Sequence, residues 1–268
     1  YRSFAALALA RALFICALFF TALFLACAAG AVKGIIASAP ELRPDSITPM
    51  GFATSVYDSE GNLTETLVMA GSNREEASFE ELPQDLIDAF VAIEDARFWQ
   101  HNGIDTRSIM RAVAGVVKGD SSSGGGSTIT QQLIKNNVFN GGREKTFGEK
   151  LQRKLQEQAL ALQLEKQMDK QLILTNYLNT INLGNNALGV KVAARRYFNK
   201  EVSDLTLSEC TVLAGITQNP SRLNPISGQE ANAEKRKVIL RYMLDQGYIT
   251  KKEQTEALSD NVYERIQN

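Results

Sequence analysis

The stretch LPQDLIDAFVAIEDAR, residues 82–97, carries the pattern that decides the fold class. Pro83 suits the first turn of a helix, and the apolar residues after it recur at spacings of three and four. These residues are Leu86, Ala89, Phe90 and Ile93. The pattern predicts an amphipathic helix over 85–97, near whose end lie two adjacent carboxylates, Glu94 and Asp95.

Helical spacing continues towards the C-terminus, whereas strand-like residues precede position 82. The further predicted helices begin near Thr128 and cover 149–168, 169–179, 190–198, 207–216 and 230–245. Residues 51–70 predict a β-hairpin, because strand-like segments 54–57 and 63–68 flank turn-forming residues at 58–62. With so little strand, the region after the hairpin is predicted to be mainly α.

An apolar run without charge, from Ala12 to Val32, lies at the N-terminal side. As a helix it would be about 32 Å long, enough for a hydrocarbon core of about 30 Å. Arg2 and Arg11 precede it and only Lys33 follows closely. The positive-inside rule therefore predicts a single-pass anchor in the cell membrane, with a cytoplasmic N-terminus and an extracellular or periplasmic C-terminal domain. A cleaved signal peptide is the alternative, although its apolar core usually spans about 7–15 residues.

Length and composition allow one anchor and one sizeable domain, because 44% of the 268 residues are apolar. We predict an anchor over 1–33, a connector with the hairpin over 34–80, and a helical catalytic domain over 81–268. Lys plus Arg number 29 and Asp plus Glu 30, so no basic field suggests nucleic acid as a partner. The single histidine, His101, excludes a two-histidine metal site.

The carboxylate pair is the first candidate for chemistry. Adjacent helical positions point about 100° apart, so Glu94 and Asp95 cannot share one substrate atom. We expect one to face a cleft while the other binds backbone or a basic side chain. A carboxylate at a helix C-terminus meets an unfavourable dipole, and a raised pKa there suits a general base. An ordinary solvated pair is the alternative for an isolated Glu-Asp.

A glycine-rich turn is the second candidate. Gly124, Gly125 and Gly126 precede Ser127 and Thr128 at a predicted helix start, where free N–H groups can bind an anion. Gln132 and Lys135 follow Thr128 at +4 and +7, on one helical face. The Gly-Lys-Ser/Thr of a nucleotide-binding loop is missing. A plain linker is the alternative for the glycines alone.

A third candidate is Arg153 with Glu157, an i,i+4 pair that by itself predicts a surface ion pair. The three segments together supply two glutamates, a lysine, an arginine and an anion-binding turn. Transfer from a diphosphate-linked sugar needs such a set, because the leaving diphosphate requires cations more than a proton. One carboxylate base would then serve the acceptor hydroxyl.

At this point the sequence resembles the peptidoglycan glycosyltransferases of family 51, which occur alone or at the N-terminal side of class A penicillin-binding proteins. Five ordered blocks between about 80 and 225 carry the resemblance. The blocks are Glu94-Asp95-x-x-Phe98-x-x-His101-x-Gly103, Gly125 to Leu133, Arg153-Lys154-x-x-Glu157, Tyr177 to Phe198, and Leu207 to Pro225. The resemblance implies a lysozyme-like helical head with a small membrane-associated jaw subdomain, an N-terminal β-hairpin and one transmembrane helix.

The resemblance also implies an activity. Such an enzyme polymerises lipid II, a disaccharide-peptide on undecaprenyl diphosphate, into β-1,4-linked peptidoglycan, with the growing glycan as donor. Inversion at the anomeric carbon releases undecaprenyl diphosphate. Glu94 would be the base for the acceptor 4-hydroxyl. Glu157 would be a second catalytic carboxylate, which either positions a divalent metal (Mg or Mn) or stabilises developing positive charge. No organic cofactor is expected.

The implied substrate-binding residues come from all but the last block. They are Asp95, Phe98, His101, Ser127, Thr128, Gln132, Lys135, Asn136, Arg153, Lys154, Asn179 and Tyr197. Structural support is the alternative for Asn179 and Tyr197. Residues 119–127 are expected to form a mobile lid beside the donor site. Besides lipid II and glycan, the implied partners are the bilayer, moenomycin-type inhibitors and cell-wall synthesis proteins.

The sequence departs from the family pattern at three points, and two other functions remain as alternatives. Thr175 stands where the family usually has Glu, and the separation of Glu94 from Glu157, 157 − 94 = 63, is longer than we expect. No Ser-x-x-Lys occurs, so we expect no transpeptidase within this sequence. We expect either a monofunctional enzyme or the N-terminal part of a bifunctional one. The competing functions are a membrane-anchored lytic glycosidase and a non-catalytic scaffold that binds lipid II.

Overall fold

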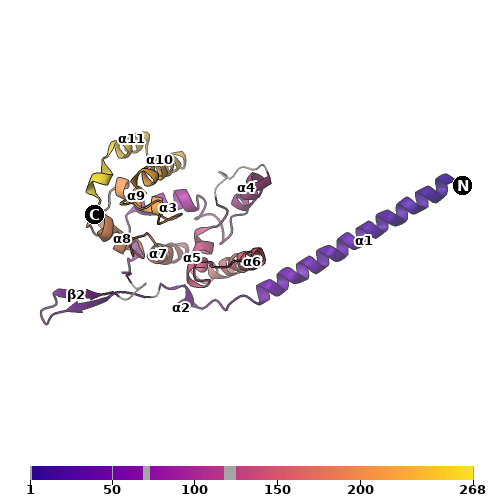
Figure 1. The fold of residues 1–268 in the computed structure, drawn as a ribbon, viewed down its shortest axis with the longest axis horizontal. Coiled ribbons are helices and arrows are strands. Elements are labelled where there is room, and N and C mark those ends of the chain that lie inside the picture. The colour runs from indigo at the N-terminus through magenta and orange to yellow at the C-terminus, as the bar shows by residue number, and fades with distance from the viewer. Residues whose placement is uncertain (1, 50, 69–72, 118–124, 268) are drawn as a thin grey trace.

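The apolar run forms one long helix, α1 (Arg2–Ala37), in the computed structural model, which describes residues 2–49, 51–68, 73–117 and 125–267. Its segment Arg11–Ala37 is long and apolar enough to cross a membrane by length and composition. The helix projects from the helical body (Figure 1) and continues four residues beyond the expected end of the anchor at 33. Its side chains from 11 to 34 are exposed, as an anchor requires.

The connector and the hairpin follow α1. A short helix, α2 (Pro44–Ile47), places Ile47 in the core, and the Ile47 carbonyl accepts a hydrogen bond from Asn137 Nδ2 at 2.6 Å. Strands β1 (Thr54–Tyr57) and β2 (Leu63–Leu67) pair antiparallel, which confirms the predicted hairpin. The hairpin projects away from the helices (Figure 1) and is the only sheet among the described residues.

The remainder is helical, which confirms the predicted fold class. The α-helices are α3 (Gln84–Glu94), α4 (Thr106–Val117), α5 (Ile129–Asn137), α6 (Phe147–Leu164), α7 (Lys170–Thr180), α8 (Val190–Phe198), α9 (Leu207–Ile216), α10 (Gln229–Asp245) and α11 (Lys251–Ser259). The 3₁₀ turns are Phe79–Glu81, Val202–Asp204 and Val262–Arg265. Every predicted helix is present. Helices α4 and α11 were not predicted, and α3 ends three residues before the predicted position 97.

Local signals explain where these helices begin. Thr128, Thr146, Thr206 and Thr250 are N-caps whose side chains accept a hydrogen bond from the third helical N–H, and the Glu or Gln at that position bonds back. These capping boxes satisfy N–H groups that the helix itself leaves unpaired.

Packing brings the end of α3 to the start of α5. Helix α3 packs against α9 and α10, and α5 packs between α6 and α7. The Phe90 and Tyr177 rings meet edge to face at 6.4 Å and join α3 to α7. Helix α6 also packs on α1, where Gln156 Nε2 donates to the Ile35 carbonyl at 3.0 Å. The anchor is therefore attached to the helix that carries Arg153 and Glu157.

Candidate active site

The carboxylate pair diverges because α3 ends between its two members. Glu94 is the last helical residue, and Asp95 is the C-cap with φ −157° and ψ 74°. Glu94 Oε2 accepts a hydrogen bond from Gln132 Nε2 at 2.8 Å, and Oε1 accepts one from the Thr217 hydroxyl at 2.5 Å. Buried Asp95 instead accepts the Ile129 N–H at 3.0 Å. Asp95 therefore binds backbone, as expected for one member of the pair, although both residues line the cleft.

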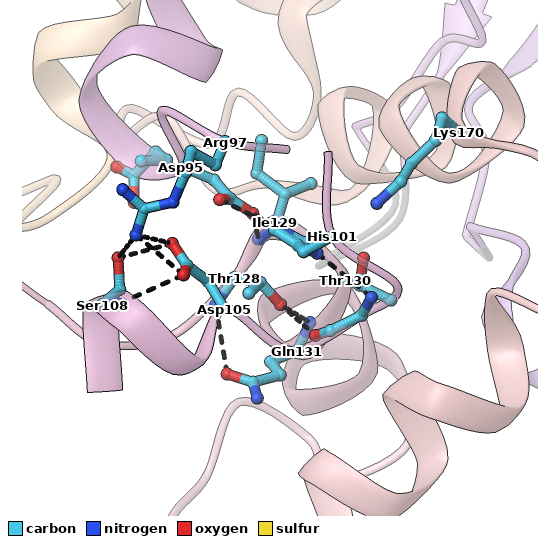
Figure 2. Close-up of polar contacts among 12 residues, drawn as sticks. Asp95, Arg97, His101, Asp105, Ser108, Thr128, Ile129, Thr130, Gln131 and Lys170 are labelled. Carbon is cyan, nitrogen blue, oxygen red and sulfur yellow. Dashed lines mark hydrogen bonds and ion pairs between the residues drawn. The ribbon is translucent and has the colours of Figure 1, made fainter. Parts of the chain in front are cut away.

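Asp95 lies beside His101 in the buried region next to the cleft (Figure 2). His101 Nε2 lies 2.9 Å from Asp95 Oδ2, and the His101 ring meets the edge of the buried Phe98 ring. Lys170 Nζ lies 4.4 Å from the centre of the Phe98 ring and pairs with Glu165. Burial lowers the pKa of Lys170, and Glu165 opposes that shift. Neither Phe98 nor His101 lines the Glu94 cleft, so the structure places these two expected substrate-binding residues as its support.

The start of α5 differs from the expected anion site. The Thr128 hydroxyl accepts the Gln131 N–H at 3.2 Å and donates to the Gly103 carbonyl at 2.7 Å, so it serves as a cap (Figure 2). The Ile129 N–H is taken by Asp95. The prediction of free N–H groups at this helix start is therefore wrong for Ile129 and Gln131, because Asp95 and Thr128 accept their hydrogen bonds. Most of the expected lid, 119–127, lies outside the described residues.

Glu157 is fully buried between two cations on its own helix. Arg153 Nη1 pairs with Oε1, and Lys154 Nζ lies 2.8 Å from Oε2. Arg153 Nε also donates to Glu144 at 2.7 Å. Partial burial lowers the pKa of Arg153, but hydrogen bonds and charge from Glu144 and Glu157 outweigh it, and the net shift of the pKa is upward. The surface ion pair, our alternative for Arg153 and Glu157, is not what the structure shows.

A divalent metal does not fit this arrangement. Both carboxylate oxygens of Glu157 already pair with a cation, one with Arg153 and the other with Lys154. A divalent metal such as Mg²⁺ or Mn²⁺ needs oxygen ligands that are not occupied in this way. The described residues also contain no cluster of three His, Cys, Asp or Glu side chains. We therefore derive no step from a metal at Glu157.

The cleft that holds Glu94 has a volume of about 640 Å³. Of the expected residues it is lined by Glu94, Asp95, Ser127, Thr128 and Gln132. Further lining residues, none of them predicted, include Arg97, Arg111, Gln218, Tyr242 and Gln246.

The expected cations are placed differently. Lys135, Asn136, Arg153 and Lys154 are all absent from the lining of the cleft, so the structure does not place these four expected substrate-binding residues in the pocket of Glu94. Lys154 connects α6 to the edge of the cleft, because its Nζ donates to the hydroxyl of Ser127 at 2.8 Å and Ser127 lines the cleft.

Asn179 and Tyr197 lie outside the cleft, in the core. The Asn179 side chain bonds both the N–H and the carbonyl of Ala77, and the Tyr197 hydroxyl donates to the Leu183 carbonyl at 2.7 Å. Structural support, the alternative for both, agrees with these contacts. Thr175, the departure from the family pattern, donates to the Gln171 carbonyl of its own helix.

The sequence did not predict that Thr217 and Lys235 interact with Glu94. Thr217 lies just after α9, 123 residues from Glu94. Lys235, on α10, donates to Gln218 Oε1 at 2.9 Å, and burial lowers the pKa of Lys235 while the charge of Glu94 opposes that shift. Neither has a local motif that would have revealed it, because both approach Glu94 only through the packing of α9 and α10 on α3.

The fold and the site together define a helical protein with an apolar anchor and a carboxylate held in a polar cleft. The family model described as Transglycosylase matches residues 60–244. The chain therefore belongs to the transglycosylase family.

Individual relatives agree with this. The chain is 41% identical over 240 residues to penicillin-binding protein 1A of Clostridium perfringens (strain 13), covering 85% of this chain and 34% of that protein. It is 42% identical over 205 residues to penicillin-binding protein 1F of Bacillus subtilis, covering 76% and 28%. The crystal structure of penicillin-binding protein 1A from Haemophilus influenzae is similar with a TM-score of 0.45 and 26% identity, over 80% and 21%. The chain thus spans about a third or less of these relatives. Together with α1, the relatives from Clostridium perfringens and Bacillus subtilis indicate a membrane-anchored protein.

Proposed function

We propose that this chain is a peptidoglycan glycosyltransferase that polymerises lipid II into β-1,4-linked strands and releases undecaprenyl diphosphate. The observation that carries the proposal is Glu94, a carboxylate held at the cleft by Gln132 and Thr217 in a member of the transglycosylase family. The test is polymerisation of lipid II by the purified chain, with glycan and undecaprenyl diphosphate as the expected products.

The proposed reaction needs one base and a set of cations. Glu94 takes the proton of the acceptor 4-hydroxyl as that oxygen attacks the anomeric carbon of the donor glycan. The bond from that carbon to the diphosphate breaks, and the configuration inverts. The diphosphate leaves as an anion, so positive charge stabilises it better than a proton would.

We assign the main positive charge for the diphosphate to Lys154 and Arg153 of α6. The Lys154 side chain is 41% exposed and sits beside Ser127 at the cleft, whereas the Arg153 side chain is 11% exposed and pairs with two glutamates. Lys154 is therefore the cation free to move to a diphosphate, and Arg153 is the fixed one. In the absence of substrate, Glu157 pairs with both cations. Lys135 and Asn136, near the end of α5, would add further contacts to the diphosphate.

A lytic glycosidase is less well supported by the same contacts. A glycosidase needs a protonated carboxyl group to donate to the leaving oxygen. Both oxygens of Glu94 instead accept hydrogen bonds, from Gln132 and Thr217, so neither is arranged to donate a proton to a leaving oxygen. Incubation with purified cell-wall glycan separates the two, because shortened strands would support the glycosidase.

The proposed orientation puts the N-terminus in the cytoplasm and the catalytic domain outside. On α6, the helix that contacts α1, Phe147 is 81% exposed and Leu151 48% exposed, one turn apart. We propose that this apolar pair meets the bilayer beside the anchor, where the lipid tail of the substrate remains.

The double variant Phe147→Ser, Leu151→Ser tests the membrane contact. We expect polymerisation of lipid II in vesicles to fall by about tenfold, because burial of two apolar side chains is lost. The rate with detergent-solubilised lipid II should stay unchanged. Leu258→Ser, at a 44% exposed leucine of α11, is the matched control. An equal loss in vesicles and in detergent would refute the bilayer contact.

A further inference from the structure

The two carboxylate oxygens of Glu94 have different surroundings. Oε2 is held by Gln132, which lines the cleft, whereas Oε1 is held by Thr217, which does not. A substrate hydroxyl that enters through the cleft therefore meets the Gln132 side first. It can replace the Gln132 amide at Oε2 while the bond from Thr217 to Oε1 remains.

We propose that Thr217 is a positioning residue for Glu94. Its hydroxyl holds Oε1, so that Oε2 is the oxygen that accepts the proton. The inference rests on the proposed function, because it assigns a role within the same reaction. It also names the atom that acts as the base, which the family assignment alone does not.

The hydroxyl of Thr217 suits a carboxylate that changes charge in each cycle. It has one proton and two acceptors within reach, Glu94 Oε1 at 2.5 Å and the Ala214 carbonyl at 3.2 Å. While Glu94 is ionised, the proton points to Oε1. Once Glu94 has taken the proton of the acceptor hydroxyl, the Thr217 proton can turn to Ala214 without movement of heavy atoms. The proton on Glu94 then passes to water, and the cycle closes.

The charged and titratable groups around Glu94 come from several elements. Lys235 of α10 and Asp95 of α3 lie near it, and the cleft also exposes Arg97 and Arg111. Burial, with the charges of Glu94 and Asp95, raises the pKa of Tyr177 on α7. All of these groups stay in place when only the Thr217 hydroxyl is removed. A hydrogen bond donated to a carboxylate favours its ionised form, so removal of the Thr217 hydroxyl should change the pH profile of the activity.

The experiment is the pH dependence of kcat/KM for lipid II polymerisation, with Thr217→Val beside the wild type. Valine keeps the shape of threonine and lacks the donor. The activity depends on ionised Glu94, so the acid limb should move upward by about one pH unit. Thr217→Ser should restore it. Thr255→Val is the matched control, because Thr255 bonds only the Lys251 carbonyl on exposed α11.

Each result decides between the inference and its alternatives. An acid limb that stays in place in a folded Thr217→Val enzyme would overturn the inference and leave Thr217 a packing residue. If Thr217→Val does not fold, Thr217→Ala is measured with the same expected shift. Glu94→Gln separates a failure of the Thr217 role from a failure of Glu94 as the base. If Glu94→Gln is inactive and Thr217→Val has an unmoved limb, only the role of Thr217 fails. If Glu94→Gln remains active, Glu94 is not the base and the role of Thr217 fails with it. If the wild type forms no glycan from lipid II, the proposed function itself fails.

Discussion

Glu94→Gln should reduce polymerisation of lipid II by about a thousandfold, because the amide cannot accept the proton of the acceptor hydroxyl. Glutamine has the size of glutamate, and its oxygen can still accept the hydrogen bond from Thr217. The fold and the binding of lipid II should therefore be retained. The measurement is the initial rate of glycan formation, beside a direct binding assay and a thermal melt.

The control for Glu94→Gln is Glu256→Gln, an exposed glutamate of α11 whose lysine neighbour lies at 3.8 Å. It should polymerise at the wild-type rate. A Glu94→Gln enzyme that keeps its rate would show that the base is elsewhere. If wild type and variant both bind lipid II and neither forms glycan, the chain is the scaffold that the sequence left open.

Glu157→Gln has the second largest expected effect, because it removes the only negative charge between Arg153 and Lys154 in a fully buried position. The two cations then repel each other, although Arg153 keeps Glu144. We expect the free energy of unfolding to fall by about 3 kcal/mol. Polymerisation should fall by about a hundredfold, because the diphosphate loses its prearranged cations. Urea unfolding and initial rates measure the two effects.

Glu144→Gln is the matched control for Glu157→Gln, since it removes the other carboxylate beside Arg153. The Glu144 side chain is 20% exposed, whereas that of Glu157 is fully buried, so Glu144→Gln should lower the free energy of unfolding less than Glu157→Gln does. The loss of rate in Glu157→Gln should be the same with and without added Mg²⁺ or Mn²⁺. A rate that is restored by either metal would contradict our account of the Glu157 surroundings.

The sequence predicted most of the helices, since apolar residues that recur at helical spacing must face a common core. It missed α11 because that helix buries only Gln254 and Ala257 and so carries almost no apolar stripe. It placed the end of α3 too late, because the C-cap geometry at Asp95 depends on the contacts of Asp95 with Ile129 and His101. Both contacts come from residues beyond the helix.

The expectation at α5 failed for a similar reason. A glycine turn before Ser127 and Thr128 predicts unpaired N–H groups at a helix start, and that prediction is sound for an isolated helix. In the folded chain, Asp95 takes the Ile129 N–H before any ligand can. The sequence likewise predicted a surface ion pair between Arg153 and Glu157. In the structure Glu157 is fully buried, because α6 packs against α5 and α1.

The sequence by itself determined the apolar anchor, the hairpin, the helical fold class and Glu94 as the candidate base. These follow from hydrophobic periodicity and from motifs whose members are close along the chain. Only the tertiary structure decided that Thr217 bonds Glu94, that Lys235 lies close enough to feel its charge, and that Lys154 bonds Ser127 at the cleft. The physical reason is that hydrogen bonds and charges act over a few ångströms of space, and only packing decides which distant residues come that close.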